Sequence, residues 1–309
     1  YIAIGAPFHG TKDTGSVRIF RESSGVWNTV GNELVGMSEH DWIGRKVAMS
    51  PTNYIRVAIA GLSHDSRGVK SGVVRVYFYV RPSEQRPTGQ WMQLGADITD
   101  ASAGDESGYS LDISDDGSKL VIGSPFSDAG GTSAGQVRIF ELNGSTWTPM
   151  GNAIYGIAAY DRTGSAVGIS GDGLSVIIGS PGALDDTGKA LVYVWDSSTS
   201  DWVKRGSDVN GGDSGDCLGR EVGISFNGLK IAISVTKSGG RSSNAGYTKV
   251  LEWTTAAGTS ESGAWVVMRD IIRGETADDR SGSAISLAGD GSRVAIGAPM
   301  NDGNDTDSG

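Results

Sequence analysis

Several residue types are scarce in this chain of 309 residues, and each scarcity excludes a class of protein or site. The single cysteine, Cys217, excludes a disulfide within the chain and a cysteine-based zinc site. The 26 lysines and arginines are outnumbered by 36 acidic residues, which argues against a nucleic-acid partner, because such partners require a basic surface. Apolar runs reach only five to seven residues, so we expect no membrane insertion.

Proline is also rare, at 8 residues, whereas glycine reaches 48. This composition fits neither collagen nor a flexible linker, and it predicts many tight turns. No segment has an apolar helical period longer than two turns, which favours an all-β chain. The chain opens with YIAIGAP, which predicts a strand, and closes on a second version of the same element. We therefore expect a segment cut from a longer repetitive chain.

A repeated signature organises the sequence. A tryptophan is followed fourteen residues later by an aspartate, and three residues after that by a glycine, in five copies. The tryptophans are Trp27, Trp91, Trp147, Trp202 and Trp265, and the aspartates are Asp41, Asp105, Asp161, Asp216 and Asp279. Successive tryptophans are 55 to 64 residues apart. A constant offset within copies of varying length indicates structural repeats.

Each repeat contains four segments with strand patterns. The glycine precedes a strand such as YSLDIS, and an Asp-Gly or Asn-Gly pair then predicts a two-residue hairpin turn. The next segment, such as KLVIGSP, is apolar throughout, which is typical of a strand buried on both faces. The third alternates, and the fourth carries the tryptophan. Four antiparallel strands repeated about every 60 residues predict a β-propeller, with a β-sandwich as the alternative.

The number of blades follows from a second, longer period. Modules three apart resemble each other more than neighbours do, as HDWIGRKVAMS and GDCLGREVGIS illustrate. A duplicated unit of three modules favours six blades within a range of five to seven, and an array that never closes is the alternative. We place the repeats of this single propeller segment, 1–309, at 1–40, 41–104, 105–160, 161–215, 216–278 and, in part, 279–309.

The run DISDDGSKLVIGSPFSDAGGTSAGQVRIF resembles an FG-GAP repeat, the blade of the integrin α-chain propeller. The similarity covers nearly the whole chain at the level of modules, and the tryptophan and aspartate signature resembles secreted repeat proteins of microbial and algal surfaces. The resemblance implies an extracellular structural or adhesion protein, with protein partners or self-association in an assembly, and no enzyme. The family's calcium sites are not carried over, because the Asp-Gly turn is too short to wrap the ion.

The repeated aspartates and tryptophans are best explained by structural roles that every blade needs. An aspartate beside a turn can accept hydrogen bonds from backbone N–H groups, and a tryptophan can pack one blade against the next. A ring of cation-binding carboxylates and a ring of sugar-binding tryptophans are the functional alternatives.

One group of loop residues breaks the repeat and is the predicted ligand-binding patch. It comprises His9, His40, Asp41, Trp42, His64 and Asp65, all expected on one face of the propeller. Trp42 stands where the other copies have mostly polar residues, namely Glu106, Arg162, Cys217 and Arg280. A glycan held by this patch would make the protein lectin-like. A propeller hydrolase or lyase is the second alternative, although no Ser-His-Asp order, HExxH motif or phosphate loop is present.

Two further features concern the loops. Asp302, Asp305 and Asp307 alternate in the last loop and could hold one Ca²⁺, with a solvated loop as the alternative. Apart from calcium, the sequence indicates no cofactor. Asn143 and Asn304 begin acceptor patterns for N-glycosylation, which agrees with an extracellular location.

Overall fold

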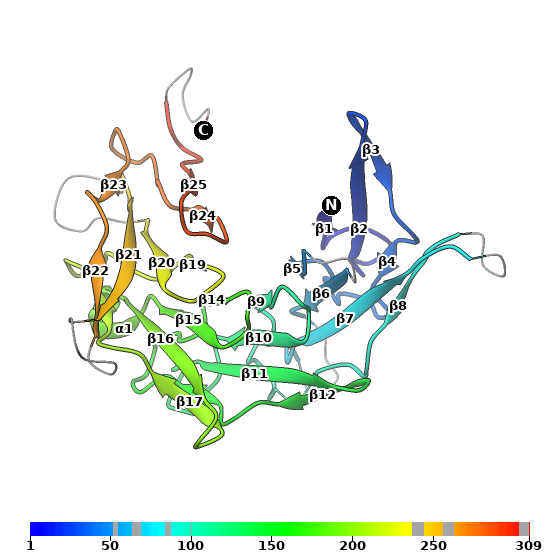
Figure 1. The fold of residues 1–309 in the computed structure, drawn as a ribbon, viewed down its shortest axis with the longest axis horizontal. Helices are drawn as coiled ribbons and strands as arrows, with labels where there is room; N and C mark the ends of the chain where they lie inside the picture. The colour runs from blue at the N-terminus through cyan, green and yellow to red at the C-terminus, as the bar shows by residue number, and fades with distance from the viewer. Residues whose placement is uncertain are drawn as a thin grey trace.

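A computed structural model describes residues 1–51, 55–63, 69–83, 88–99, 101–236, 244–255, 263–302 and 309. These residues form successive antiparallel sheets (Figure 1). The first sheet comprises β1 (Ile2–Ala6), β2 (Ser16–Ser23), β3 (Val26–Thr29) and β4 (Leu34–Val35). The second comprises β5 (Lys46–Met49), β6 (Arg56–Gly61), β7 (Val73–Val80) and β8 (Gln90–Gln93).

The next two sheets have five strands each. The third sheet comprises β9 (Ser110–Ile113), β10 (Lys119–Ser124), β11 (Gln136–Asn143), β12 (Thr146–Pro149) and β13 (Ile154–Tyr155). The fourth comprises β14 (Ala166–Ile169), β15 (Ser175–Ser180), β16 (Lys189–Asp196), β17 (Asp201–Lys204) and β18 (Val209–Asn210), with the short helix α1 (Ala183–Asp186) before β16.

The last two sheets end the described fold. The fifth sheet comprises β19 (Val222–Ile224), β20 (Lys230–Val235), β21 (Tyr247–Thr255), β22 (Gly263–Val267) and β23 (Ile272–Arg273), and the sixth comprises β24 (Ala284–Leu287) and β25 (Val294–Gly297). No helix in the described ranges has the length and apolar character that crossing a bilayer requires.

The sheets stand side by side like the blades of a propeller, which confirms the predicted fold class. Their first strands lie on the inner side, where β5, β9, β14, β19 and β24 contact one another in succession. Figure 1 shows that the sheets form an arc, which stays open between β1 and the sixth sheet.

In the second to fifth sheets the second strand is buried on both faces, as its apolar run predicts. In β10, Leu120 and Ile122 pack with Val76 of the second sheet, whereas Val121 packs with Val167 of the fourth sheet. All three β10 side chains have no exposed surface. Because successive side chains of a strand point to opposite faces, one strand contributes to two inter-sheet cores.

The repeated tryptophan joins each sheet to the one before it. Its indole N–H donates to the carbonyl three residues after the tryptophan of the preceding sheet, at 2.7 to 3.1 Å. The donor–acceptor pairs are Trp91–Val30, Trp147–Leu94, Trp202–Met150 and Trp265–Arg205. Trp27, in the first described sheet, is 50% exposed. The tryptophans therefore act as inter-sheet packing residues.

The glycine four residues after the tryptophan makes room for this contact. A Cβ at Gly31 would lie 2.8 Å from Trp91 Cδ1, and one at Gly151 would lie 3.0 Å from Trp202 Cδ1. Both glycines also have a positive φ. The chain leaves the sheet there and returns in a short extra strand, such as β13 or β18, that pairs with the third strand of the sheet. The sequence did not predict this fifth strand.

The repeated aspartates are buried at turns between sheets. One oxygen of each accepts hydrogen bonds from backbone N–H groups three or four residues earlier, as Asp216 does from Gly212 and Asp213 at 2.8 and 3.1 Å. Asp41, Asp105, Asp161 and Asp279 do the same. These carboxylates hold the turns, as the structural interpretation proposed.

The hairpin between the first two strands is longer than predicted. Ser114 N–H donates to the Lys119 carbonyl across four residues, and Gly117 has a positive φ whereas Asp116 does not. The Asp116 side chain instead accepts from Ser114 Oγ at 2.6 Å and from Ser118 N–H at 2.8 Å. A hydrogen-bonded Asp side chain allows the wider turn, so the two-residue prediction was wrong. The second module's Asn53-Tyr54 lies outside the described residues.

The inter-sheet hydrogen bond predicts unequal effects of one substitution at two repeat positions. Trp202→Phe should lower the free energy of unfolding by about 1–3 kcal/mol, because the buried Met150 carbonyl loses its donor. Trp27→Phe should change it by no more than about 0.5 kcal/mol, because Trp27 is exposed. Urea unfolding of both variants measures the difference, and equal losses would contradict the proposed role of the indole.

Candidate functional site

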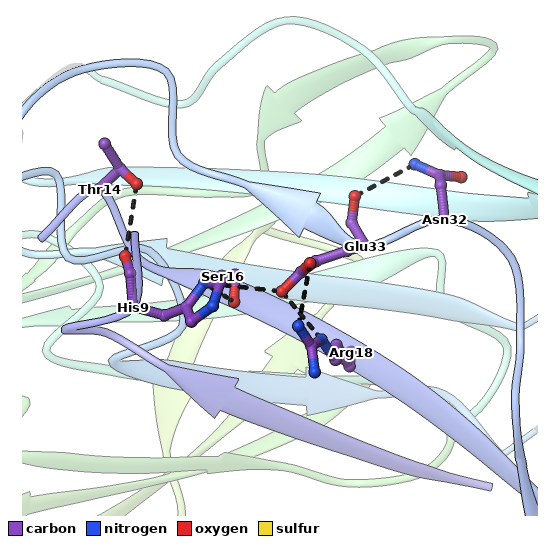
Figure 2. Close-up of polar contacts among 6 residues, drawn as sticks. All are labelled: His9, Thr14, Ser16, Arg18, Asn32 and Glu33. Carbon is purple, nitrogen blue, oxygen red and sulfur yellow. Dashed lines mark hydrogen bonds and ion pairs between the residues drawn. The ribbon is translucent and has the colours of Figure 1, made fainter. Parts of the chain in front are cut away.

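The predicted patch is divided between two turns. His9 lies in a polar cluster of the first sheet, where its Nδ1 is 3.2 Å from Ser16 Oγ and 3.8 Å from Glu33 Oε1 (Figure 2). Arg18 donates to both oxygens of Glu33, at 2.9 and 3.3 Å. These hydrogen bonds from Arg18, with a smaller contribution from Ser16, lower the pKa of Glu33.

This cluster does not have the geometry of a nucleophile–base–acid relay. In such a relay one imidazole nitrogen faces the serine and the other faces the acid. Here the same nitrogen of His9 faces both Ser16 and Glu33. The cluster is an ion-pair network on the first sheet.

The second turn contains His40, Asp41 and Trp42. Asp41 is buried and accepts from the N–H groups of Met37 and Ser38, so its role is in the turn. His40 Nδ1 is 4.0 Å from Asp13 Oδ2, and Trp42 packs edge-on against Phe8 at 5.8 Å. His64 and Asp65, the remaining members of the patch, lie outside the described residues.

The unusual residue type at Trp42 has a partial explanation in the backbone. Its counterparts Glu106, Arg162, Cys217 and Arg280 all have a φ between 50° and 54°, as Trp42 does. The backbone conformation therefore belongs to the repeat, and the side chain at this position is free to vary.

The predicted loop sites are only partly described. Asp302 and Asn143 are exposed, whereas Asn304, Asp305 and Asp307 lie outside the described residues. Within the described ranges, no group of three or more His, Cys, Asp or Glu side chains is placed to hold a metal ion. The calcium and glycosylation hypotheses stay predictions.

A different site lies between the fifth and sixth sheets. A cavity of about 400 Å³ is lined by Arg220, Thr236, Asn244, Arg280 and Ser283. Within the part of the chain that the structure describes, neither arginine forms an ion pair. Two guanidinium groups that form no ion pair there, beside hydroxyl and amide groups, suit an anionic ligand.

The same two repeat positions between the second and third sheets carry balanced charges. Arg45 is the counterpart of Arg220, and Glu106 is the counterpart of Arg280. Burial raises the pKa of Glu106, and the nearby Lys70 and Arg45 lower it less. Between the fifth and sixth sheets, Arg280 stands at the position that Glu106 has between the second and third sheets.

Glu221 faces the same side of the fifth sheet as the cavity. Gly223, two residues along the strand, would place a Cβ 3.1 Å from Leu287 Cβ of the sixth sheet, whereas Val222 and Ile224 pack toward the fourth sheet. Alternation therefore directs Glu221 toward the sixth sheet. Burial raises its pKa, and Lys46 and Arg220 lower it less.

A second carboxyl group lies on the inner side of the arc. Asp112 of β9 accepts from Ile113 N–H at 2.9 Å and from Ile169 N–H of the next inner strand at 3.0 Å. Burial raises its pKa to about 6, and Lys46 lowers it less. Asp112 connects the third and fourth sheets at their inner edges.

No sequence pattern singled out the cavity between the fifth and sixth sheets. Arg280 stood out only as a counterpart of Trp42, and Arg220 and Glu221 were not predicted as site residues. A detectable signal existed, because Arg220 follows the repeated Asp-x-x-Gly and Arg280 lies inside the next copy of that motif. Only the structure shows that these two positions meet across one sheet interface.

No protein-family model matches the chain, and no curated protein is similar to it in sequence. Solved structures share its fold. A "putative 6-phosphogluconolactonase" from Bacteroides uniformis has a TM-score of 0.55 and 15% identity, over 98% of this chain and 79% of that chain. Sqt1 from Chaetomium thermophilum, a β-propeller, has a TM-score of 0.50 and 13% identity, over 96% of this chain and 63% of that chain.

These similarities establish the fold alone, but they correct the functional expectation. We expected a non-catalytic structural or adhesion module and no enzyme, and that expectation was wrong in light of the lactonase-type neighbour. The expectation rested on strict repetition in the sequence. That repetition reflects inter-sheet packing, which a catalytic propeller needs as much as a structural one.

The raised pKa of Asp112 predicts a pH effect on stability. An unfolded Asp titrates at about 3.9, so the folded protein holds this proton more tightly than the unfolded chain does. Its contribution to the free energy of unfolding is present below about pH 4 and is lost as the pH rises through about 6. The measured quantity is the unfolding free energy of the wild type minus that of Asp112→Asn, between pH 4 and 7.5.

The Asn variant keeps an oxygen acceptor for Ile169 N–H and does not titrate. The difference should fall as the pH rises through this window and be flat above pH 7. A difference that rises with pH, or is constant, would show that burial does not raise this pKa.

Proposed function

We propose that the chain is a hydrolase of small phosphorylated substrates, with its site in the cavity between the fifth and sixth sheets. The observation that carries this proposal is the presence of two arginines without an ion pair in the described residues, with the half-buried carboxyl group of Glu221 close to Arg220. Arg220 and Arg280 would bind the phosphate of the substrate, since guanidinium groups match phosphate oxygens in pairs. The fold of the lactonase-type neighbour is compatible with this reaction class.

Glu221 is the proposed general base. Burial raises the pKa of Glu221, and a carboxyl group with a raised pKa is a better proton acceptor than an ordinary one. For a lactone, Glu221 would take a proton from water while the water oxygen bonds to the carbonyl carbon. The ring C–O bond then breaks, and the proton passes to the departing oxygen, which regenerates the carboxylate. Lys46 lies near enough to favour the ionised form of Glu221.

The test compares hydrolysis of 6-phosphogluconolactone with that of unphosphorylated gluconolactone. We expect Glu221→Gln to lower kcat by about 10²–10⁴-fold on the phosphorylated lactone, because the general base is lost. Arg220→Gln and Arg280→Gln should each raise KM for the phosphorylated lactone by about 10–100-fold, since each removes a charge-assisted contact. Neither arginine variant should change KM for the unphosphorylated lactone.

Arg45→Gln is the matched control, because Arg45 has the repeat position of Arg220 but lies beside Glu106. It should leave both kinetic constants unchanged. Wild-type protein that accelerates neither lactone, or Glu221→Gln with full activity, would refute the proposal.

A further inference from the structure

A second cavity lies beside the start of β21. It has a volume of about 550 Å³ and lies between the turn before the fifth sheet and the turn after it. The residues that matter to its chemistry are Asp213, Asp216, Tyr247, Lys249, Arg273 and Glu275. None of them lines the cavity of Arg220 and Arg280.

Tyr247 fixes the centre of this cavity. It is 7% exposed, and its hydroxyl donates to Asp216 Oδ2 at 3.0 Å. Two cations lie over its ring, with Lys249 Nζ at 5.7 Å and Arg273 Cζ at 5.6 Å from the centroid. The other sheets have Ser16, Val73, Gln136 and Lys189 at this position, so the aromatic platform is particular to the fifth sheet.

The first and second sheets have an acid beside the cation at this strand position, and the fifth sheet does not. Lys249 is the counterpart of Arg18 and Arg75, which are paired with Glu33 and Asp97 at 2.9 and 2.7 Å. Glu33 directly precedes Leu34, which pairs with Val17. Asp97 directly precedes Ile98, which pairs with Val74. In the fifth sheet that place is taken by Ile271, because Ile272 pairs with Thr248.

The fifth sheet has also gained a cation. Arg273 pairs in register with Tyr247, where the first sheet has Val35 opposite Ser16. Within the described residues Arg273 has no ion pair, and Lys249 Nζ donates only to the Asn210 carbonyl, at 3.3 Å. Burial lowers the pKa of Lys249, the nearby Asp216 carboxylate raises it by less, and repulsion from Arg273 lowers it by less again. An anion between the two cations would relieve that repulsion.

Carboxylates that suit hydroxyl groups also line the cavity. Asp213 and Glu275 lie on its two turns, together with the backbone of Gly212 and Gly274. Asp213 is close enough to Tyr247 to contribute to the raised pKa of that phenol, which burial raises most. Carboxylates accept hydrogen bonds from hydroxyls and repel a second anion, so the ligand should carry its negative charge at one end only.

We infer that this cavity is a binding site for a sugar carboxylate, with the carboxylate held between Lys249 and Arg273 and the hydroxyls against the Tyr247 ring and the carboxylates that line the cavity. The site is separate from the proposed hydrolytic cavity and does not depend on it. The ligand class follows from three features together: two neighbouring cations that form no ion pair in the described residues, the Tyr247 ring beneath them, and carboxylate acceptors that line the same cavity.

The test is calorimetric titration of the intact chain with gluconate, and separately with sorbitol and with acetate. Gluconate has both the carboxylate and the hydroxyls, whereas sorbitol lacks the charge and acetate lacks the hydroxyls. We expect gluconate to bind at least about 10-fold more tightly than either comparator, since each lacks contacts worth about 1.4 kcal/mol or more. Lys249→Gln and Arg273→Gln should each weaken gluconate binding by about 10-fold or more.

Two matched variants make the result specific. Arg18→Gln removes the cation at the same strand position of the first sheet, and Arg220→Gln removes a cation of the other cavity; both should leave gluconate affinity unchanged. Thermal unfolding of each variant checks that the fold is retained. Absence of gluconate binding, equal binding of acetate, or loss of binding in Arg220→Gln but not in Arg273→Gln would each overturn the inference.

Discussion

The hydrogen bond from each repeated indole to the preceding sheet is the constraint on which the rest of the architecture depends. It sets the distance between neighbouring sheets, because the ring must pass over a glycine to reach the carbonyl. The same glycine breaks the fourth strand and sends the chain back to the third strand as a short fifth strand. The aspartate-held turn then delivers the chain to the inner strand of the next sheet. One repeated motif thus determines spacing, strand order and the path between sheets.

Because this framework lies in the backbone and the buried tryptophans, the loop side chains at the sheet interfaces can change without loss of the fold. The position of Trp42 shows this freedom, since Glu106 and Arg280 share its backbone conformation. At the first cavity, an arginine stands in place of an acid at that position. In the second cavity, Ile271 stands where the first sheet has Glu33. Both changes fall in the fifth and sixth sheets, within a chain whose net charge is −10.

The fold was predictable because its signals are local and repeated. Alternation in the third strands and continuous apolar runs in the second strands report burial directly, and Leu120, Val121 and Ile122 are buried on both faces as expected. The hairpin turn was predicted too short, because the Ser114–Asp116 side-chain contact that supports the wider loop has no counterpart in simple turn patterns. The predicted patch was chosen for sequence irregularity, yet Asp41 is bound within its own turn and His9 within an ion-pair network. A residue that differs between repeats can therefore mark a position where the fold tolerates substitution, and not only a functional position.

The sequence by itself determined the repeat, the strand types and the structural roles of tryptophan and aspartate, since these depend on spacing along one chain and on burial. The tertiary structure alone decided which charges remain without a counterion. Arg220 and Arg280 are 60 residues apart, and they line one cavity only because successive sheets stack. Whether Lys249 has an acidic partner likewise depends on strand register, which places Ile271 where the first sheet has Glu33. Electrostatic compensation depends on distance in space, and that distance is set when the sheets pack.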